Sequence, residues 1–355
     1  MTRTTFYLLD EELHPWRLDD EALLPWPDCR YFGQVLREVD RASPQLGLRF
    51  VLTKRLHGPL PLQGDDVVVV CLGDELSVMP GYAHDVRLVA KTYGVRRRSN
   101  LRPAPFRPLS AFSATVVQEA IVQGRRAPSF VRSQLRTVRR RYEPMVIDVP
   151  LGLYLLEDVP FQAFDDRKYD VSYAGSRTNR ARETKRRVPT QKLRSRRELE
   201  SVLSALAASP RDFELAVRLI GTFQDAASHS TAYSQLLMDS RVTLCPRGGS
   251  LETYRFFEAL RCGCVPISEQ LPDREYYSQA PGIRVRSWLE LPKVLDTLLS
   301  DSDALRAAHQ EVMQWWADRC SPNAIARRLL GALDAPMQGA PRRIVGGRRQ
   351  RNLVR

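Results

Sequence analysis

Residues 241–267 contain the pattern that most restricts how this chain can fold. Two short apolar segments, Arg241–Cys245 and Cys264–Ile267, have the character of buried strands. Between them lie a loop with two glycines and a predicted helix, Ser250–Arg261. Because consecutive parallel strands need a crossover connection, usually a helix, this stretch predicts a right-handed βαβ unit in a parallel sheet.

The same alternation of strands and helices continues along the chain. The clearest strand is Val67–Leu72, a continuous apolar run typical of parallel sheets that are covered on both faces. Other predicted strands are Phe6–Leu9, Leu48–Leu52, Val86–Ala90, Asp170–Ser176 and Phe213–Ile220. Predicted helices are Phe32–Val39, Ala114–Val122, Glu198–Ala208, Tyr233–Asp239, Leu289–Leu299 and Asp303–Leu333. Such alternation predicts an α/β protein with parallel sheets.

A length of 355 residues suits two domains rather than one. We expect one α/β domain over residues 1–160 and a second over residues 161–335, with a cleft between them. Residues 336–355 are rich in glycine and arginine and contain no acid. We therefore expect a basic, disordered tail there.

The net charge of +13 is concentrated in arginine clusters. These are Arg96–Arg98, Arg139–Arg141 and the segment Arg177–Arg197, which holds ten basic residues and one acid. Clusters of this kind suit the phosphates of a nucleotide, a nucleic acid or an anionic lipid. Arg177–Arg197 contains no aromatic side chain on which bases could stack, which counts against nucleic-acid binding.

The sequence favours a cytoplasmic location. Its longest apolar run is far shorter than the roughly 20 residues of a membrane-spanning helix, and the N-terminus turns acidic before a signal sequence could form. Six cysteines without paired spacing indicate reduced thiols. The basic clusters add the expectation of peripheral contact with an anionic membrane.

The loop and helix after Cys245 have the chemistry of an anion site. Gly248 and Gly249 let a phosphate approach the backbone, Arg247 adds a guanidinium, and Ser250 is the expected helix cap. Arg255 and Glu258, three residues apart, share a helix face. From helix geometry alone this pair is either a ribose-binding pair or a local salt bridge.

Three motifs in this stretch resemble the C-terminal domain of exostosin-like glycosyltransferases. They are Leu244–Gly248 (LCPRG), Arg255–Leu260 (RFFEAL) and Gly263–Ile267 (GCVPI), in the family's order. Tyr169–Ser176 resembles the first strand and turn of that domain, and the likeness covers about residues 168–333. The resemblance implies the GT-B architecture: two Rossmann-like domains with parallel sheets facing across a cleft.

The resemblance also implies an activity: transfer of a sugar from a nucleotide-sugar donor, with UDP favoured, to a glycan or another hydroxyl acceptor. No cofactor or metal is expected, because helix dipole and arginine stabilise the leaving diphosphate in GT-B enzymes. Asp301–Asp303 spells a metal motif, but its place between two helices is better explained by capping. The implied donor-binding residues are Gly175, Ser176, Arg177, Arg247, Gly248, Gly249, Ser250, Arg255 and Glu258.

The stereochemistry expected is inversion. Many retaining GT-B enzymes place two glutamates eight residues apart around this helix. Here Ser250 stands eight residues before Glu258, and the nearer Glu252 stands six before it. This departure from the retaining pattern favours an inverting reaction, which requires a general base.

The candidate bases lie in the first domain. Asp74 and Glu75 directly follow the strand Val67–Leu72, at the end where parallel sheets present ligands, and His84 lies ten residues further on. The alternative interpretations are that Asp74 caps the next turn, that Asp85 balances Arg87, and that His84 is a surface residue. Two alternative functions stay open: a nucleic-acid-binding protein, or a catalytically inactive GT-B binding module.

Overall fold

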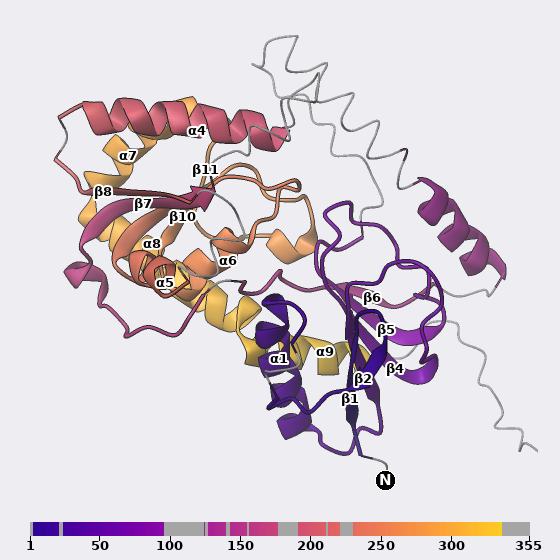
Figure 1. Cartoon of the computed structure of the whole chain (residues 1–355). Coiled ribbons are helices and arrows are strands. Elements are labelled where there is room, and N and C mark those ends of the chain that lie inside the picture. Colours follow the sequence, from indigo (N-terminus) through magenta and orange to yellow (C-terminus); the bar gives the residue numbers. More distant parts are fainter. Residues whose placement is uncertain are drawn as a thin grey trace, which may run out of the picture.

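The structure is a computed structural model, and it consists of two α/β domains, each built on a parallel sheet (Figure 1). It describes residues 3–20, 24–95, 124, 127–139, 143–154, 156–176, 191–210, 212–220 and 230–335. The predicted helix 114–122, the tail 336–355 and most of the basic segment 177–197 lie outside these residues.

The first domain has six strands in the order β2-β1-β3-β4-β5-β6. All neighbours pair in parallel except β2, which runs antiparallel to β1 at the edge. The strands are β1 (Thr5–Leu9), β2 (Leu13–Pro15), β3 (Arg49–Thr53), β4 (Gly64–Cys71), β5 (Val86–Lys91) and β6 (Val146–Asp148), and the helix α1 spans Asp28–Ala42.

The valine run in β4 explains why the sheet lies between two hydrophobic cores. Val68 and Val70 pack into the core on the side of α1, whereas Val67 and Val69 pack into a second core on the opposite face. Side chains alternate between the faces of a strand, so a strand covered on both faces must be apolar at every position. The prediction of a doubly covered parallel strand is confirmed.

The second domain has five strands, all parallel, in the order β11-β10-β9-β7-β8. They are β7 (Tyr169–Ser176), β8 (Leu215–Ile220), β9 (Ser240–Cys245), β10 (Val265–Ser268) and β11 (Ile283–Arg284). The helices are α4 (Gln191–Ala208), α5 (Ser230–Met238), α6 (Tyr254–Arg261), α7 (Leu291–Leu299) and α8 (Ser302–Trp315). Helices α4 and α7 cover one face of the sheet, and α5 and α6 cover the other.

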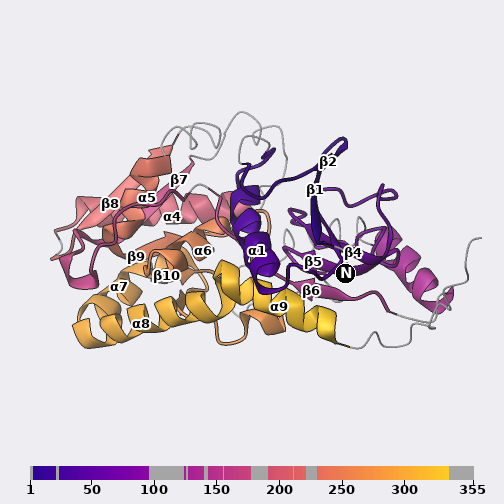
Figure 2. The same cartoon turned by 90° about the horizontal axis from the view of Figure 1, so that it is seen from below.

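The chain ends by returning to the first domain. After α8 it makes one π-helical turn, Trp316–Cys320, and enters α9 (Pro322–Asp334), which lies beside α1 (Figure 2). Leu329 of α9 and Val35 of α1 belong to the same hydrophobic core. The Arg87 guanidinium donates to the carbonyl of Leu333 at 2.8 Å. The last helix of the chain is therefore packed against the first.

The expected architecture of two Rossmann-like domains is confirmed by the two parallel sheets. Asp301 caps α8 by accepting a hydrogen bond from the Ala304 amide at 2.9 Å, which confirms the capping interpretation of that acid. The expected start of α6 is wrong: the helix begins at Tyr254, with Thr253 at its N-cap, so Ser250 lies in the preceding loop. Residues 246–253 form a longer loop than the sequence suggested.

Candidate functional site

The carboxyl ends of both sheets approach each other at the domain boundary. In the first domain β4, β5 and β6 end at residues 71, 91 and 148, and in the second β9 and β10 end at residues 245 and 268. Open parallel sheets bind ligands at this end of their strands. The candidate site is thus formed by the loops that follow these strands, one set from each domain.

Glu75 is the first-domain residue that reaches the glycine loop of the second domain. A β-carbon added at Gly249 would collide with the Glu75 carboxylate and would lie 2.7 Å from its Cδ atom. One added at Gly248 would meet Glu75 Oε1 only at 3.9 Å. Glu75 is exposed, and among the described residues its carboxylate pairs with no cation. It is an open carboxylate beside the predicted donor loop.

Asp74, the neighbouring candidate, holds the turn that presents Glu75. Its carboxylate accepts hydrogen bonds from the amides of Leu76 (3.2 Å) and Val78 (2.6 Å), which confirms the capping interpretation. It also pairs at 3.0 Å with Lys91, whose side chain is fully buried. Asp74 has a φ of 70°, in the left-handed region that few residues other than glycine adopt. These contacts fix a strained backbone next to Glu75.

His84 lies away from this boundary. It is buried rather than on the surface, and its Nε2 lies 3.0 Å from Thr137 Oγ1 in the helix 127–139. Asp85 pairs with Arg136 at 3.3 Å and not with Arg87 as expected. The structure therefore brings Glu75 and Asp74 to the domain boundary and leaves His84 in the packing of another helix.

The loop after β9 is tied to the end of β10. The Arg247 amide donates to Glu269 Oε2 at 3.1 Å, and the Ser195 hydroxyl donates to the same oxygen at 2.5 Å. The Arg247 guanidinium bonds to Gln191 at the start of α4, and Ser250 is buried. Glu269 was not predicted as a site residue; its place directly after β10 was the available signal.

Arg255 is a half-buried cation beside this loop. Its guanidinium lies 5.6 Å from the centre of the Tyr173 ring. Its Nε atom is buried and has no hydrogen-bond partner within the described part of the chain. Burial lowers the pKa of Arg255, but neighbouring groups, led by Tyr173, raise it by more, so the net pKa shift is upward and the side chain stays charged. A half-buried, charged guanidinium with an unused donor is suited to an anionic ligand.

Glu258 is held by hydrogen bonds within the protein. Its carboxylate accepts from the Tyr233 hydroxyl at 2.6 Å and from the amide of Tyr154 at 3.0 Å. Burial raises the pKa of the Tyr233 phenol, and the charge on Glu258 raises it further. Tyr154 lies on the segment that connects the two domains, so Glu258 anchors this connection. Its predicted part in binding the ribose stays a prediction.

The remaining predicted donor residues lie at the end of β7. Gly175 packs so closely on Tyr173 that an added β-carbon would lie 2.7 Å from the Cζ atom of that ring. Ser176 is the last residue of β7, and Arg177 lies outside the described residues. Glycine at 175 is therefore explained by its close approach to an aromatic ring.

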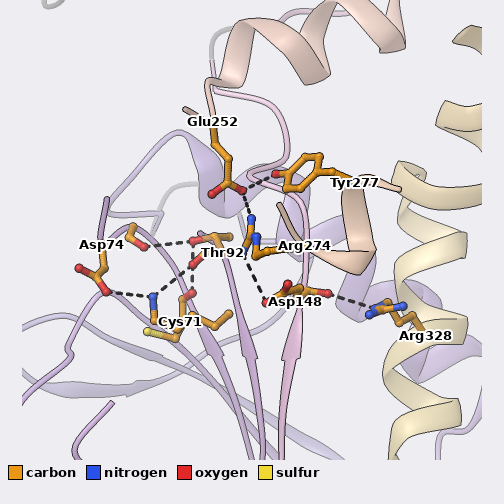
Figure 3. Close-up of polar contacts among 10 residues, drawn as sticks. Cys71, Asp74, Thr92, Asp148, Glu252, Arg274, Tyr277 and Arg328 are labelled. Atoms are coloured by element: carbon orange, nitrogen blue, oxygen red, sulfur yellow. Dashed lines mark hydrogen bonds and ion pairs between the residues drawn. The ribbon is translucent and has the colours of Figure 1, made fainter. Parts of the chain in front are cut away.

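A row of polar side chains that no sequence pattern predicted crosses the domain boundary (Figure 3). Glu252, in the loop before α6, accepts hydrogen bonds from Arg274 and from the hydroxyl of Tyr277. Arg274 in turn lies 3.4 Å from Asp148 at the end of β6, and the backbone carbonyl of Asp148 accepts from Arg328 of α9 at 3.1 Å. Burial raises the pKa of Glu252, although Arg274 and Tyr277 act in the opposite direction.

A second interaction across the domain boundary is a hydrogen bond between the first residue of α6 and the first residue of α1. The Tyr254 hydroxyl, at the beginning of α6, donates to Asp28 at 2.8 Å, and Lys54 lies 3.1 Å from the other oxygen of that carboxylate. Asp28 is fully buried at the beginning of α1. The domains thus meet through polar, hydrogen-bonded contacts around Glu75 and the glycine loop.

The described residues contain no group of three or more His, Cys, Asp or Glu side chains placed to hold a metal ion. No helix among them is long and apolar enough to cross a membrane. The expectations of metal independence and of a cytoplasmic location stay predictions.

A comparison with known proteins found similarity in part of the second domain. Residues 188–323 match the family model described as the RXYLT1 C-terminal domain. Ribitol-5-phosphate xylosyltransferase 1 of Mus musculus is 27% identical over 100 residues, which are 24% of this chain and 22% of that protein. The protein of the same name from Danio rerio is 29% identical over 108 residues, 26% of this chain and 25% of that protein. The chain thus spans about a quarter of the length of the curated relatives it matches.

Two solved structures with some likeness to this chain are described as glycosyltransferases. WaaG, described as involved in lipopolysaccharide biosynthesis, is 12% identical with a TM-score of 0.39, covering 88% of this chain and 98% of that one. AviGT4, described as involved in avilamycin A biosynthesis, is 10% identical with a TM-score of 0.41, covering 86% and 89%. Both scores are below 0.5, so the assignment of the architecture rests on the two sheets described above. The matched family segment contains the glycine loop, α6 and β10, but not the turn that carries Glu75.

Proposed function

We propose that this chain is a glycosyltransferase. It moves a sugar from a nucleotide-sugar donor, with UDP favoured, to a hydroxyl of a glycan or another acceptor, without a metal and with inversion. One observation carries the proposal: the open carboxylate of Glu75, from the first domain, lies against Gly249 in the glycine loop of the second. The description of the family model that matches residues 188–323 and the name of the curated relatives support the same class of reaction.

In this proposal the second domain holds the nucleotide diphosphate. Gly248 and Gly249 allow a phosphate to approach the backbone, and Arg247 and Arg255 supply guanidinium groups. Arg255 is half-buried and charged and has an unused donor, so it is suited to pair with the anion. Fixed charges of this kind stabilise the negative charge that develops on the leaving diphosphate.

The first domain supplies the base. The Glu75 carboxylate takes the proton from the acceptor hydroxyl as its oxygen forms a bond to the anomeric carbon of the sugar. The bond from that carbon to the diphosphate oxygen breaks, and the nucleoside diphosphate leaves with the electron pair. Because attack and departure occur on opposite faces of the sugar, the configuration is inverted.

Two adjacent glycines give a matched test of the contact that carries this proposal. Gly249→Ala places a methyl group on the Glu75 carboxylate and is expected to lower kcat/KM by at least about tenfold, as displacement of a catalytic group does. Gly248→Ala adds the same methyl where its nearest neighbours lie at 3.6 to 3.9 Å, so it should leave the Glu75 carboxylate in place and lower kcat/KM less than Gly249→Ala does. Steady-state turnover of a UDP-sugar by both variants would measure this; equal effects would contradict the role of the contact.

Arg255→Ala is expected to abolish binding of the donor nucleotide at micromolar concentration. Isothermal titration calorimetry with UDP, GDP, CDP and ADP measures this binding and identifies the nucleobase that the site prefers. Arg261→Gln is the matched control, because Arg261 ends the same helix but is exposed and lies 3.9 Å from an exposed Asp158. A nucleotide that binds the wild type and Arg255→Ala equally well would show that the donor site lies elsewhere.

A further inference from the structure

The helix 127–139 has its polar side toward the protein and its apolar side toward solvent. Four of its apolar side chains are exposed: Phe130 (42%), Val131 (53%), Leu135 (64%) and Val138 (75%). Val131, Leu135 and Val138 are spaced four and three residues apart, so these three form one stripe along the helix. Soluble helices normally place such a stripe in the core. Its exposure here requires an explanation.

The opposite side of the helix is fixed to the first domain by polar contacts. Ser133 is buried, and Thr137 lies 3.0 Å from the buried His84. The Arg136 guanidinium donates to the carbonyl of Gly81 and lies 3.3 Å from Asp85. Thr137 and Ser133 stand one turn apart, so this bonded side is roughly opposite the stripe of Val131, Leu135 and Val138. Turning the stripe inward would break these hydrogen bonds.

Arginines flank the apolar stripe. Arg132, Arg136 and Arg139 follow one another along a neighbouring side of the helix, and all three are exposed. The helix lies at the end of the first domain that points away from the second domain in both views (Figures 1 and 2). An apolar stripe bordered by arginines, on an outer surface, is the pattern of a helix that lies in the interface of an anionic bilayer.

We propose that the helix 127–139 docks the protein on an anionic lipid membrane. Val131, Leu135 and Val138 enter the boundary between headgroups and acyl chains, while Arg132 and Arg139 lie among the lipid phosphates. The charges favour a lipid surface over a second copy of this chain, because two such helices would bring arginines of like charge together and the chain as a whole carries +13. The polar contacts to Gly81 and His84 hold the helix in place before it meets the membrane.

Co-sedimentation of the full chain with lipid vesicles tests this surface. At about 0.1 M salt the wild type should bind vesicles of three parts phosphatidylcholine to one part phosphatidylglycerol at least about tenfold more strongly than vesicles of phosphatidylcholine alone. The triple variant Val131→Ser, Leu135→Ser, Val138→Ser should lose at least about tenfold of that binding. A control with Phe161→Ser and Leu289→Ser, two equally exposed apolar residues elsewhere, should bind like the wild type.

A fluorescent dye on the helix distinguishes insertion of the helix into the bilayer from purely electrostatic binding to the bilayer surface. All six native cysteines are buried, so the variant Leu135→Cys can be labelled selectively with an environment-sensitive dye. Its emission should shift to the blue on phosphatidylglycerol vesicles. Two results together would overturn the proposal: vesicle binding by the triple variant that equals that of the wild type, and dye emission that does not change on vesicles. They would show that other basic clusters bind the membrane. A wild-type dimer that the triple variant converts to a monomer, seen by sedimentation velocity, would also overturn it.

Discussion

Replacing Glu75 by glutamine is expected to lower kcat by about 10²–10⁴-fold, the usual contribution of a general base. Glutamine keeps the shape of the side chain beside Gly249 but cannot take a proton. The KM for the donor should therefore change little. Steady-state kinetics of Glu75→Gln measures both quantities.

The neighbouring acid provides the control for this prediction. Asp74→Asn removes a carboxylate from the same turn, but it leaves the buried Lys91 without its counter-charge. It should lower the unfolding temperature as well as activity, whereas Glu75→Gln should lower activity alone. If Asp74→Asn abolished turnover in a stable protein while Glu75→Gln stayed active, the two roles would have to be exchanged.

Replacing Arg274 by methionine is expected to lower the free energy of unfolding by roughly 3–5 kcal/mol, the cost of breaking a buried ion pair. Arg274 is only 10% exposed and joins Glu252 of the second domain to Asp148 of the first. Without it, the buried Glu252 carboxylate loses its counter-charge and must be desolvated unpaired. Urea unfolding followed by circular dichroism measures the change.

Two further variants distinguish the effect of the buried Arg274–Glu252 ion pair from the effect of an ion pair on the surface. Arg274→Met combined with Glu252→Gln removes both charges and should recover part of the lost stability, because no carboxylate is left unpaired. Arg306→Met breaks an exposed pair with Asp165 and should cost at most about 1 kcal/mol. An Arg274→Met protein as stable as the wild type would show that this row does not hold the domains together.

Local patterns predicted most of the strands and helices. The valine run of β4 predicted a doubly covered parallel strand, and the position just past its end suggested Glu75, which lies beside Gly249; its role as the base stays a prediction. Strand and helix periodicity depend only on neighbouring residues, which is why the sequence was sufficient for these elements. The helix cap was misplaced because Ser250 has the right chemistry for a cap, but the chain makes a longer loop before α6.

The missing parts of the site depend on contacts between distant residues. Glu252, Arg274 and Asp148 come from three loops in two domains, and no spacing in the sequence connects them. The helix face of Glu258 could be predicted from the sequence, but its hydrogen bonds from Tyr233 and Tyr154 could not, because those residues lie far away in the chain. The helix 127–139 was hidden for another reason: its polar side faces the protein, opposite to the usual rule.

The return of α9 to the first domain means that the backbone passes between the domains twice. One crossing lies in the segment that contains Tyr154, and the other lies at the π-helical turn Trp316–Cys320. Two covalent connections allow rotation about the line that joins them and oppose twisting about any other axis. Any hinge motion of the two domains would therefore be restricted to rotation about that one line.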